Sequence, residues 1–296
     1  AKVVAICDID EKRLKEIGEK YSINSRYINY EEMLEKEDLD GVIIATPPKY
    51  HLDPTIKALK KGLYVLLEKP MAENLETAEK IYSTAAGTNR LMVGFSLRFH
   101  SIFRRIKELI DNGTIGQPLL QWHVALGKVP STSWIGKKEI SGGMVNEHAV
   151  HVIYVFYWYA GKPTRIYSEY FTFNPNITIE DNASFTLQHE NAISTMIISW
   201  ASTHPWRKWG VVGSEGTATV ESYLGGPLTV STRRGEKFTE DYKIEVDEMY
   251  IRELEHFISC IKHRRKPVVN EEDGIIIQQI VDAIYRSSKE GKAIPI

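Results

Sequence analysis

The sequence predicts an α/β protein with a doubly wound parallel sheet, followed by an α+β domain with an open, mainly antiparallel sheet. Short apolar strands alternate with amphipathic helices up to about residue 96. Beyond that point, strand-like segments follow one another at short spacing with no helix between them. Two helical patterns complete the chain. We therefore expect one domain at 1–96 and a second at 97–296.

The first domain is expected to contain four visible strands, each a short apolar run next to polar or glycine residues. They are Val3–Cys7, Gly41–Ala45, Leu63–Leu67 and Leu91–Gly94. The helices between them present one apolar face. They are expected at Glu11–Tyr21, around Tyr30–Glu35, near Pro54–Lys61, and from a cap at Asn74 to about Ala86.

The chain contains no Gly-x-Gly-x-x-Gly turn. In a dinucleotide-binding domain this turn follows the first strand and lies roughly 20 residues before an acidic residue that contacts the adenosine ribose. Asp8 ends the first visible strand and fits the acidic position. We expect the first strand and its glycine turn upstream of Ala1, because that strand is central and its loss would leave main-chain groups unpaired.

The second domain is expected to contain an apolar helix at Met144–Tyr159, with a shorter helix at Ile102–Ile110 before it and two helices near Glu248–Lys262 and Gly274–Lys289 after it. The expected strands are separated by turn residues. They are Thr164–Phe173, Ala183–Gln188, Ala192–Trp200, Lys208–Val212, Thr217–Glu221 and Leu228–Ser231.

Composition excludes some functional classes. The 296 residues carry a formal net charge of -2, which gives no indication of a nucleic-acid partner. No apolar run approaches the length of a membrane span. Cys7 and Cys260 form no metal or redox motif, and we expect them to be reduced in a cytoplasmic protein.

Polar residues that follow two of the strands are candidates for binding a cofactor. Glu68-Lys69-Pro70 ends the strand Leu63–Leu67, at the sheet edge where ligands of open parallel sheets bind. The alternative is an ordinary charged turn. Thr46, Pro47 and His51 follow the strand Gly41–Ala45, and Thr46 and His51 offer hydrogen bonds.

The helix Met144–Tyr159 carries Glu147 and His151 four residues apart, and therefore on one face, together with His148. Polar groups on such an apolar helix need partners or a cleft. Three interpretations stay open: His151 as a general base oriented by a carboxylate, a metal site formed by Glu147, His148 and His151, or two histidines satisfied in the core.

The order of these motifs resembles that of the Gfo/Idh/MocA oxidoreductases, which include glucose–fructose oxidoreductase and inositol dehydrogenase. The matching motifs are Asp8, Ala45-Thr46-Pro47-Pro48 with His51, Glu68-Lys69-Pro70, Gly94 with Arg98-Phe99, Gly142-Gly143, Glu147 with His151, the segment 252–257 and the closing helix. The resemblance implies a Rossmann domain, a C-terminal domain with an open sheet, and NAD or NADP as cofactor. It also implies a homodimer or homotetramer formed through that sheet.

By that resemblance, Lys69 and His151 are the catalytic pair. His151 takes the hydroxyl proton of a sugar, cyclitol or polyol, and Lys69 bonds the same oxygen while a hydride leaves the carbon. Asp8, Thr46, Pro47, His51, Glu68 and Lys69 are the expected cofactor contacts, and no structural metal is expected. Asp8 favours NAD over NADP, although Lys12 and Arg13 soften that preference.

Two departures from the family pattern leave the substrate open. Glu147 stands where the family usually has Asp, and no basic residue follows Trp134. Substrate contacts are expected from Arg98, Trp134 and His148, with His204, Trp206 and Arg207 as further candidates. Two other activities remain possible: an NAD-dependent, redox-neutral glycoside hydrolase, or a non-catalytic sensor of dinucleotide or sugar.

Overall fold

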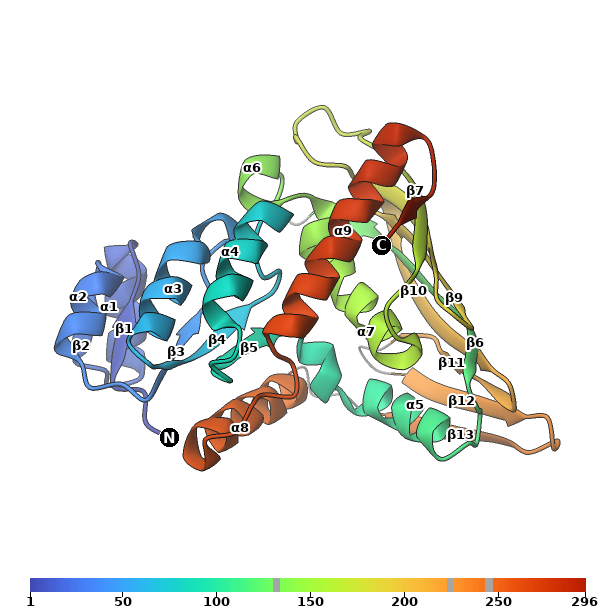
Figure 1. Cartoon of the computed structure of the whole chain (residues 1–296), viewed down its shortest axis with the longest axis horizontal. Helices are drawn as coiled ribbons and strands as arrows, with labels where there is room; N and C mark the ends of the chain where they lie inside the picture. The colour runs from blue at the N-terminus through green and yellow to red at the C-terminus, as the bar shows by residue number, and fades with distance from the viewer. Residues whose placement is uncertain (130–133, 223–225, 243–246) are drawn as a thin grey trace.

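The structure is a computed structural model that describes residues 1–129, 134–222, 226–242 and 247–296. The chain forms two units, each built around its own sheet, and helix α9 (Glu271–Glu290) runs between them (Figure 1). In the parts of the chain that are described, no helix combines the length and apolar character needed to cross a membrane.

The N-terminal unit contains parallel strands in two groups. β3 (Gly41–Ile44), β4 (Tyr64–Glu68) and β5 (Leu91–Gly94) pair in that order, and β1 (Ala5–Cys7) pairs with β2 (Ser25–Tyr27). The split between β1 and β3 falls at the position that the first strand occupies in a doubly wound sheet. The parallel Rossmann-type fold is therefore as predicted.

The helices of this unit begin where the sequence supplies caps. Side chains of Asp10, Asn29 and Asn74 accept main-chain N–H groups at the starts of three helices. The helices are α1 (Glu11–Lys20), α2 (Tyr30–Lys36), α3 (Leu52–Lys60) and α4 (Leu75–Ala85), with a short 3₁₀ turn, η1, at Pro48–Tyr50. They agree with the predicted helices to within a few residues.

The C-terminal unit is built on a nine-stranded sheet of order β13-β12-β11-β10-β6-β9-β8-β7-β14. Its strands are β6 (Pro118–Lys128), β7 (Arg165–Phe171), β8 (Asn182–Gln188), β9 (Ile193–Ser199), β10 (Ala201–Gly213), β11 (Gly216–Val220), β12 (Gly226–Thr232), β13 (Lys237–Tyr242) and β14 (Ile294–Pro295). All neighbouring pairs are antiparallel except β6 with β9. The sheet is mainly antiparallel, as predicted.

The helices of this unit precede β6, lie between β6 and β7, or follow β13. They are α5 (Ser101–Asp111), α6 (Lys138–Ser141), α7 (Val150–Ala160), α8 (Glu248–His263) and α9, with a 3₁₀ turn η2 at Ser96–Phe99. α7 and α9 pack on the sheet (Figure 1). The other face carries exposed apolar side chains at Leu120, Tyr167, Phe171, Ile193 and Ile197.

The two units interlock. The segment before α9 returns to the edge strand β5, where the N–H of Val93 donates to the carbonyl of Val269 over 3.1 Å and Met92 bridges to Asn270. Ile275 on α9 belongs to the apolar core that β3, β4, α3 and α4 form. These contacts cross residue 96, and the domain boundary there stays a prediction.

Candidate active site

The loop after β4 carries the Glu68-Lys69-Pro70 motif, and its Lys69-Pro70 peptide is cis. The strand before it is buried along its length, so the loop begins at a fixed point. The Lys69 side chain leaves this loop toward the C-terminal unit. Its Nζ lies 2.8 Å from the main-chain carbonyl of Glu147 and 3.0 Å from Glu147 Oε1.

This ion pair joins the two units. The side chains of Lys69 and Glu147 are each 14% exposed, so water screens the pair only in part. An ammonium has three donors, and two are used within the described residues. Lys69 therefore keeps a donor for a further oxygen. The extra methylene of Glu147 lets the carboxylate reach this lysine, a contact that the sequence left undecided.

Glu147 and His148 lie in a π turn, η3 (Val145–Ala149), which continues directly into α7 and His151. The N–H of Val150 bonds the carbonyl of Val145, five residues back. The sequence predicted one regular helix over Met144–Tyr159. The π turn corrects this, and such turns occur frequently at functional sites.

His151 sits beside the ion pair. Burial lowers its pKa well below the usual value for histidine, and the positive charge of Lys69 lowers it further. The ring is therefore neutral at neutral pH. Its Nδ1 is buried without a hydrogen-bond partner in the described structure. A neutral imidazole next to an ammonium can accept a proton from a bound hydroxyl group.

Two further histidines, His148 and His123, form a group with His151. Burial, then the charge of Arg207, lowers the pKa of His148 to about 3. Burial, then His148, lowers the pKa of His123 on β6 to about 3. His148 packs edge-on against Trp200, with ring centroids 5.6 Å apart. Of this group, His123 was missed by the sequence analysis.

His51 lies inside the protein rather than at the sheet edge. It is fully buried, with Nε2 2.7 Å from the carbonyl of Thr46 and Nδ1 3.0 Å from the carbonyl of Pro70. His51 therefore bridges the two strand-end loops. Its expected contact with a cofactor stays a prediction. Thr46 and Pro47 stay at the edge, partly or fully exposed.

Asp8 follows β1 and is partly exposed. Its Oδ1 accepts the N–H of Asp10 over 2.9 Å, and its Oδ2 lies 3.5 Å from the Arg13 guanidinium. A carboxylate at this strand end is suited to bond ribose hydroxyls. Arg13 is an adjacent cation that would offset its repulsion of a phosphate.

The carboxylate of Glu68 contacts its own loop, since its Oε2 accepts the main-chain N–H of Lys69 over 3.3 Å. Burial raises the pKa of this carboxyl group. On α8, burial and the proximity of Glu68 raise the pKa of Glu253 to about 8. Two nearby carboxyl groups in a buried setting favour keeping a proton. The cofactor contact of Glu68 stays a prediction.

The remaining substrate candidates are spread out. Arg98 lies over the Trp158 ring, 3.9 Å from its centroid. Trp134 packs against the C-terminal core. His204 and Trp206 are exposed on β10. In the described parts of the chain, none of these four forms a hydrogen bond or ion pair with Lys69 or Glu147, and their substrate roles stay predictions.

Residues that support the π turn were missed by the sequence analysis. Asn146 is fully buried, and its Nδ2 donates to the carbonyls of Ala72 and Ser141, each over 3.0 Å. Its Oδ1 accepts from Gln278 of α9 over 2.9 Å. The available signal was Gly142-Gly143, since paired glycines often indicate a close approach of neighbouring groups.

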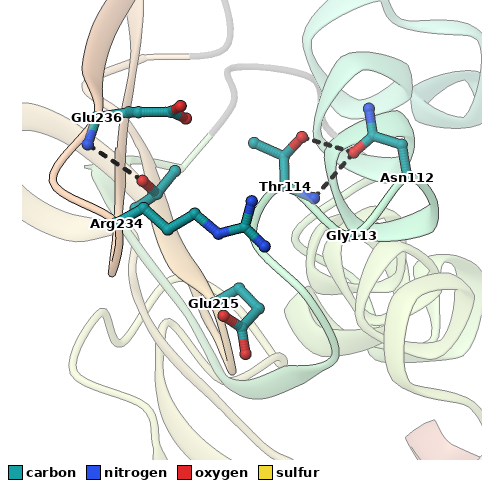
Figure 2. A pocket seen from close by; sticks show the side chains of 7 residues that line it. Asn112, Gly113, Thr114, Glu215, Arg234 and Glu236 are labelled. Carbon is teal, nitrogen blue, oxygen red and sulfur yellow. Dashed lines mark hydrogen bonds between the residues drawn. The ribbon is translucent and has the colours of Figure 1, made fainter.

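A metal site and a separate cavity are two further features to consider. The described residues contain no group of three or more potential ligands placed to hold a metal ion, so the metal interpretation of Glu147, His148 and His151 has no geometric support. A cavity of about 210 Å³ lies between the loop after α5 and the β10–β11 and β12–β13 turns, and Figure 2 shows Asn112 and Arg234 among the residues that line it. None of the candidate site residues lines it.

Comparison with protein families accounts for nearly the whole chain. Residues 1–95 match the oxidoreductase family's NAD-binding Rossmann fold, and residues 107–296 match its C-terminal alpha/beta domain. The chain belongs to the Gfo/Idh/MocA oxidoreductase family. It is therefore an NAD(P)-dependent oxidoreductase, as the resemblance of its motifs implied.

Curated relatives are similar over about nine-tenths of their own length. A D-xylose 1-dehydrogenase (NADP(+)) of Haloferax volcanii is 25% identical, covering 99% of this chain and 91% of the relative. A myo-inositol 2-dehydrogenase of Thermotoga maritima is also 25% identical, covering 99% and 90%. The fold matches the crystal structure of an Agrobacterium radiobacter oxidoreductase in complex with NAD+, L-tartaric acid and magnesium. That match has a TM-score of 0.91 at 22% identity and covers 100% of this chain and 91% of that one.

The residues present fit a nicotinamide dinucleotide at both ends. β3 and β4 are parallel neighbours, so Thr46 and Lys69 emerge at the same edge of the sheet. The partly exposed carboxylate of Asp8 suits the adenosine ribose. Within the described residues, Lys69 Nζ keeps one donor beyond its two contacts to Glu147.

Proposed function

We propose that this dehydrogenase oxidises a secondary hydroxyl group of a sugar, cyclitol or sugar derivative, or reduces the corresponding ketone. The observation that carries the proposal is the pair of Lys69 and Glu147 beside the neutral His151. The names of the relatives support it, since they include xylose and inositol dehydrogenases.

Each residue has a distinct role in this proposal. His151 accepts the hydroxyl proton, because an alcohol becomes a good hydride donor only as that proton leaves. Lys69 uses its remaining donor to stabilise the developing alkoxide. The nicotinamide group supplies the hydride acceptor when it is bound. Glu147 holds the ammonium in place and balances its charge.

The test is Lys69→Met in the full-length enzyme, assayed for NADH formation with a panel of sugars and polyols. We expect turnover to fall at least about a hundredfold, because the oxyanion loses its charged donor. Lys80→Met is the matched control, since Lys80 pairs with Glu76 on an exposed helix face. Unchanged turnover by the Lys69 variant would contradict the mechanism. Glycosidic cleavage without net NADH would instead favour the redox-neutral hydrolase.

We also propose that both NAD and NADP are accepted. Asp8 would bond the ribose hydroxyls of NAD, and Arg13, 3.5 Å from that carboxylate, could turn to a 2′-phosphate. The partial exposure of this pair supports such a movement, because the pair is not locked by packing.

The outer face of the C-terminal sheet is proposed as the interface of a homodimer or homotetramer. Ile193 pairs in register with Leu120, and Ile197 with Val124, so their side chains form a continuous apolar surface. Ile197→Lys should lower the mass measured by light scattering, whereas Ile251→Lys on exposed α8 should not.

A cytoplasmic location is also proposed. The free thiols of Cys7 and Cys260 support it.

A further inference from the structure

The π turn η3 is held by a buried cluster that lies behind it, away from Lys69. Glu180 is 3% exposed, and its Oε1 accepts the N–H of Val145 over 2.8 Å, at the first residue of the turn. The Tyr285 hydroxyl of α9 donates to the same oxygen over 2.6 Å. Glu180 Oε2 faces Lys138 Nζ at 3.4 Å. The carboxylate therefore caps the start of the π turn.

The Tyr285 hydroxyl is the junction of this cluster. It lies 3.1 Å from the carbonyl of Gly142 and 3.4 Å from the N–H of Asn146, on either side of the start of the turn. A side chain at Gly143 would place its Cβ 2.2 Å from this hydroxyl and 2.8 Å from Glu180 Oε2. Only glycine allows the chain to pass so close, which explains one residue of the Gly142-Gly143 motif.

The cluster matters because a π turn is less favourable than regular α-helix and persists where its surroundings fix it. An α-helix turns about 100° per residue, at 3.6 residues per turn. Removing the extra residue of the π turn would rotate the preceding segment by about that angle relative to α7. The main-chain carbonyl and the carboxylate of Glu147, which both contact Lys69 Nζ, would then be displaced from it.

We infer that Glu180 and Tyr285 are positioning residues that maintain the π turn and thereby place Glu147 against Lys69. Neither residue touches Lys69, and neither takes part in proton transfer. The inference rests on the proposed function for its effect on turnover, but not for its effect on the turn itself.

The test is Tyr285→Phe, compared with Tyr159→Phe. Tyr159 is a matched control because its hydroxyl bonds the carbonyl of Phe103 over 2.5 Å, in a buried place remote from the π turn. Each variant loses one hydroxyl, which for Tyr285 contacts Gly142, Asn146 and Glu180 and for Tyr159 contacts Phe103. Three quantities are measured: hydrogen–deuterium exchange of peptides covering 144–151, kcat and KM for the best polyol, and the thermal midpoint.

We expect Tyr285→Phe to accelerate exchange at 145–149 and to lower kcat about tenfold or more, with KM changed less than threefold, since small displacements at a reacting centre are costly. Tyr159→Phe should shift the midpoint similarly without either effect. If Tyr285→Phe fails to fold, Glu180→Gln replaces it. A neutral amide accepts more weakly than a carboxylate, so we expect about a threefold loss of kcat and a smaller rise in exchange.

Unchanged exchange at 145–149 in these variants would overturn the inference. Parallel losses of kcat and thermal midpoint in the Tyr285 and Tyr159 variants would also overturn it, because both would then act through stability alone. Faster exchange in an enzyme that turns over no polyol would uphold the role of the cluster and refute the proposed function instead.

Discussion

The two segments that supply the active-site residues are fixed in different ways. The loop after β4 is held by residues of its own unit. Strand β4 is largely buried, and His51, 19 residues before Pro70, bonds the carbonyl of Pro70. The π turn is held by distant residues, among them Ala72, Glu180 and Gln278. Lys69 is thus placed by its own unit, whereas Glu147 depends on contacts from both units.

Breaking the contact between these segments should have the largest effect. Glu147→Gln removes the charge that balances Lys69, and we expect kcat to fall about a hundredfold. Glu147→Asp keeps the charge but shortens the reach, so about a tenfold loss is expected. The measurement is steady-state kinetics of NADH formation. Glu76→Gln, in an exposed pair with Lys80, is the control, and an equal loss there would argue against a specific role.

The variant His51→Phe should weaken the loop that carries Lys69 without changing the π turn. The buried imidazole no longer bridges the carbonyls of Thr46 and Pro70, and we expect about 2 kcal/mol lower free energy of unfolding. A tenfold lower kcat should accompany it, because the loop that carries Lys69 loosens. His189→Phe is the matched control. His189 also bridges two groups, Gly161 and Ser194, but lies far from the loop in the sequence. Similar kcat losses in both variants would contradict a positioning role.

The free energy of unfolding should fall in acid because of the buried histidines His148 and His123. The pKa of His148 and that of His123 are about 3 in the folded protein, below the value near 6.5 expected when unfolded. The unfolded state therefore binds more protons as pH falls below 6.5. Each such histidine should lower the free energy of unfolding by about 1.4 kcal/mol per pH unit. Urea unfolding between pH 5 and 7.5 measures the slope, and His148→Gln should reduce it. An unchanged slope would mean that this ring is hydrated.

Changes outside both segments should matter least. Arg13→Ala removes the cation beside Asp8, and we expect KM for NADP to rise about threefold, since exposed ion pairs contribute little. KM for NAD should stay within twofold. Lys15→Ala on the same helix is the control. A rise in KM for NAD alone would show that Arg13 serves the ribose rather than the phosphate.

The sequence predicted the N-terminal elements well because their signals are local. Capping residues such as Asn74 and short apolar strands such as Leu91–Gly94 act within a few positions. The long strand β6 was missed. Its buried face includes Gln121 and His123, whose polar side chains interrupt the apolar alternation. Its partners, β9 and β10, lie 73 to 95 positions away along the chain, so no local pattern indicates the pairing.

The active-site residues show the same difference between local signals and long-range contacts. Lys69, Glu147 and His151 were identified from the sequence by residue type and order, because strand ends and helix faces are readable from it. Three outcomes required the tertiary structure: the burial of His51, the π turn, and the ion pair between Lys69 and Glu147. Each depends on packing between segments far apart in the chain, where desolvation and long-range hydrogen bonds decide the result. The sequence alone therefore determined which groups carry the chemistry, and the tertiary structure determined which of them meet.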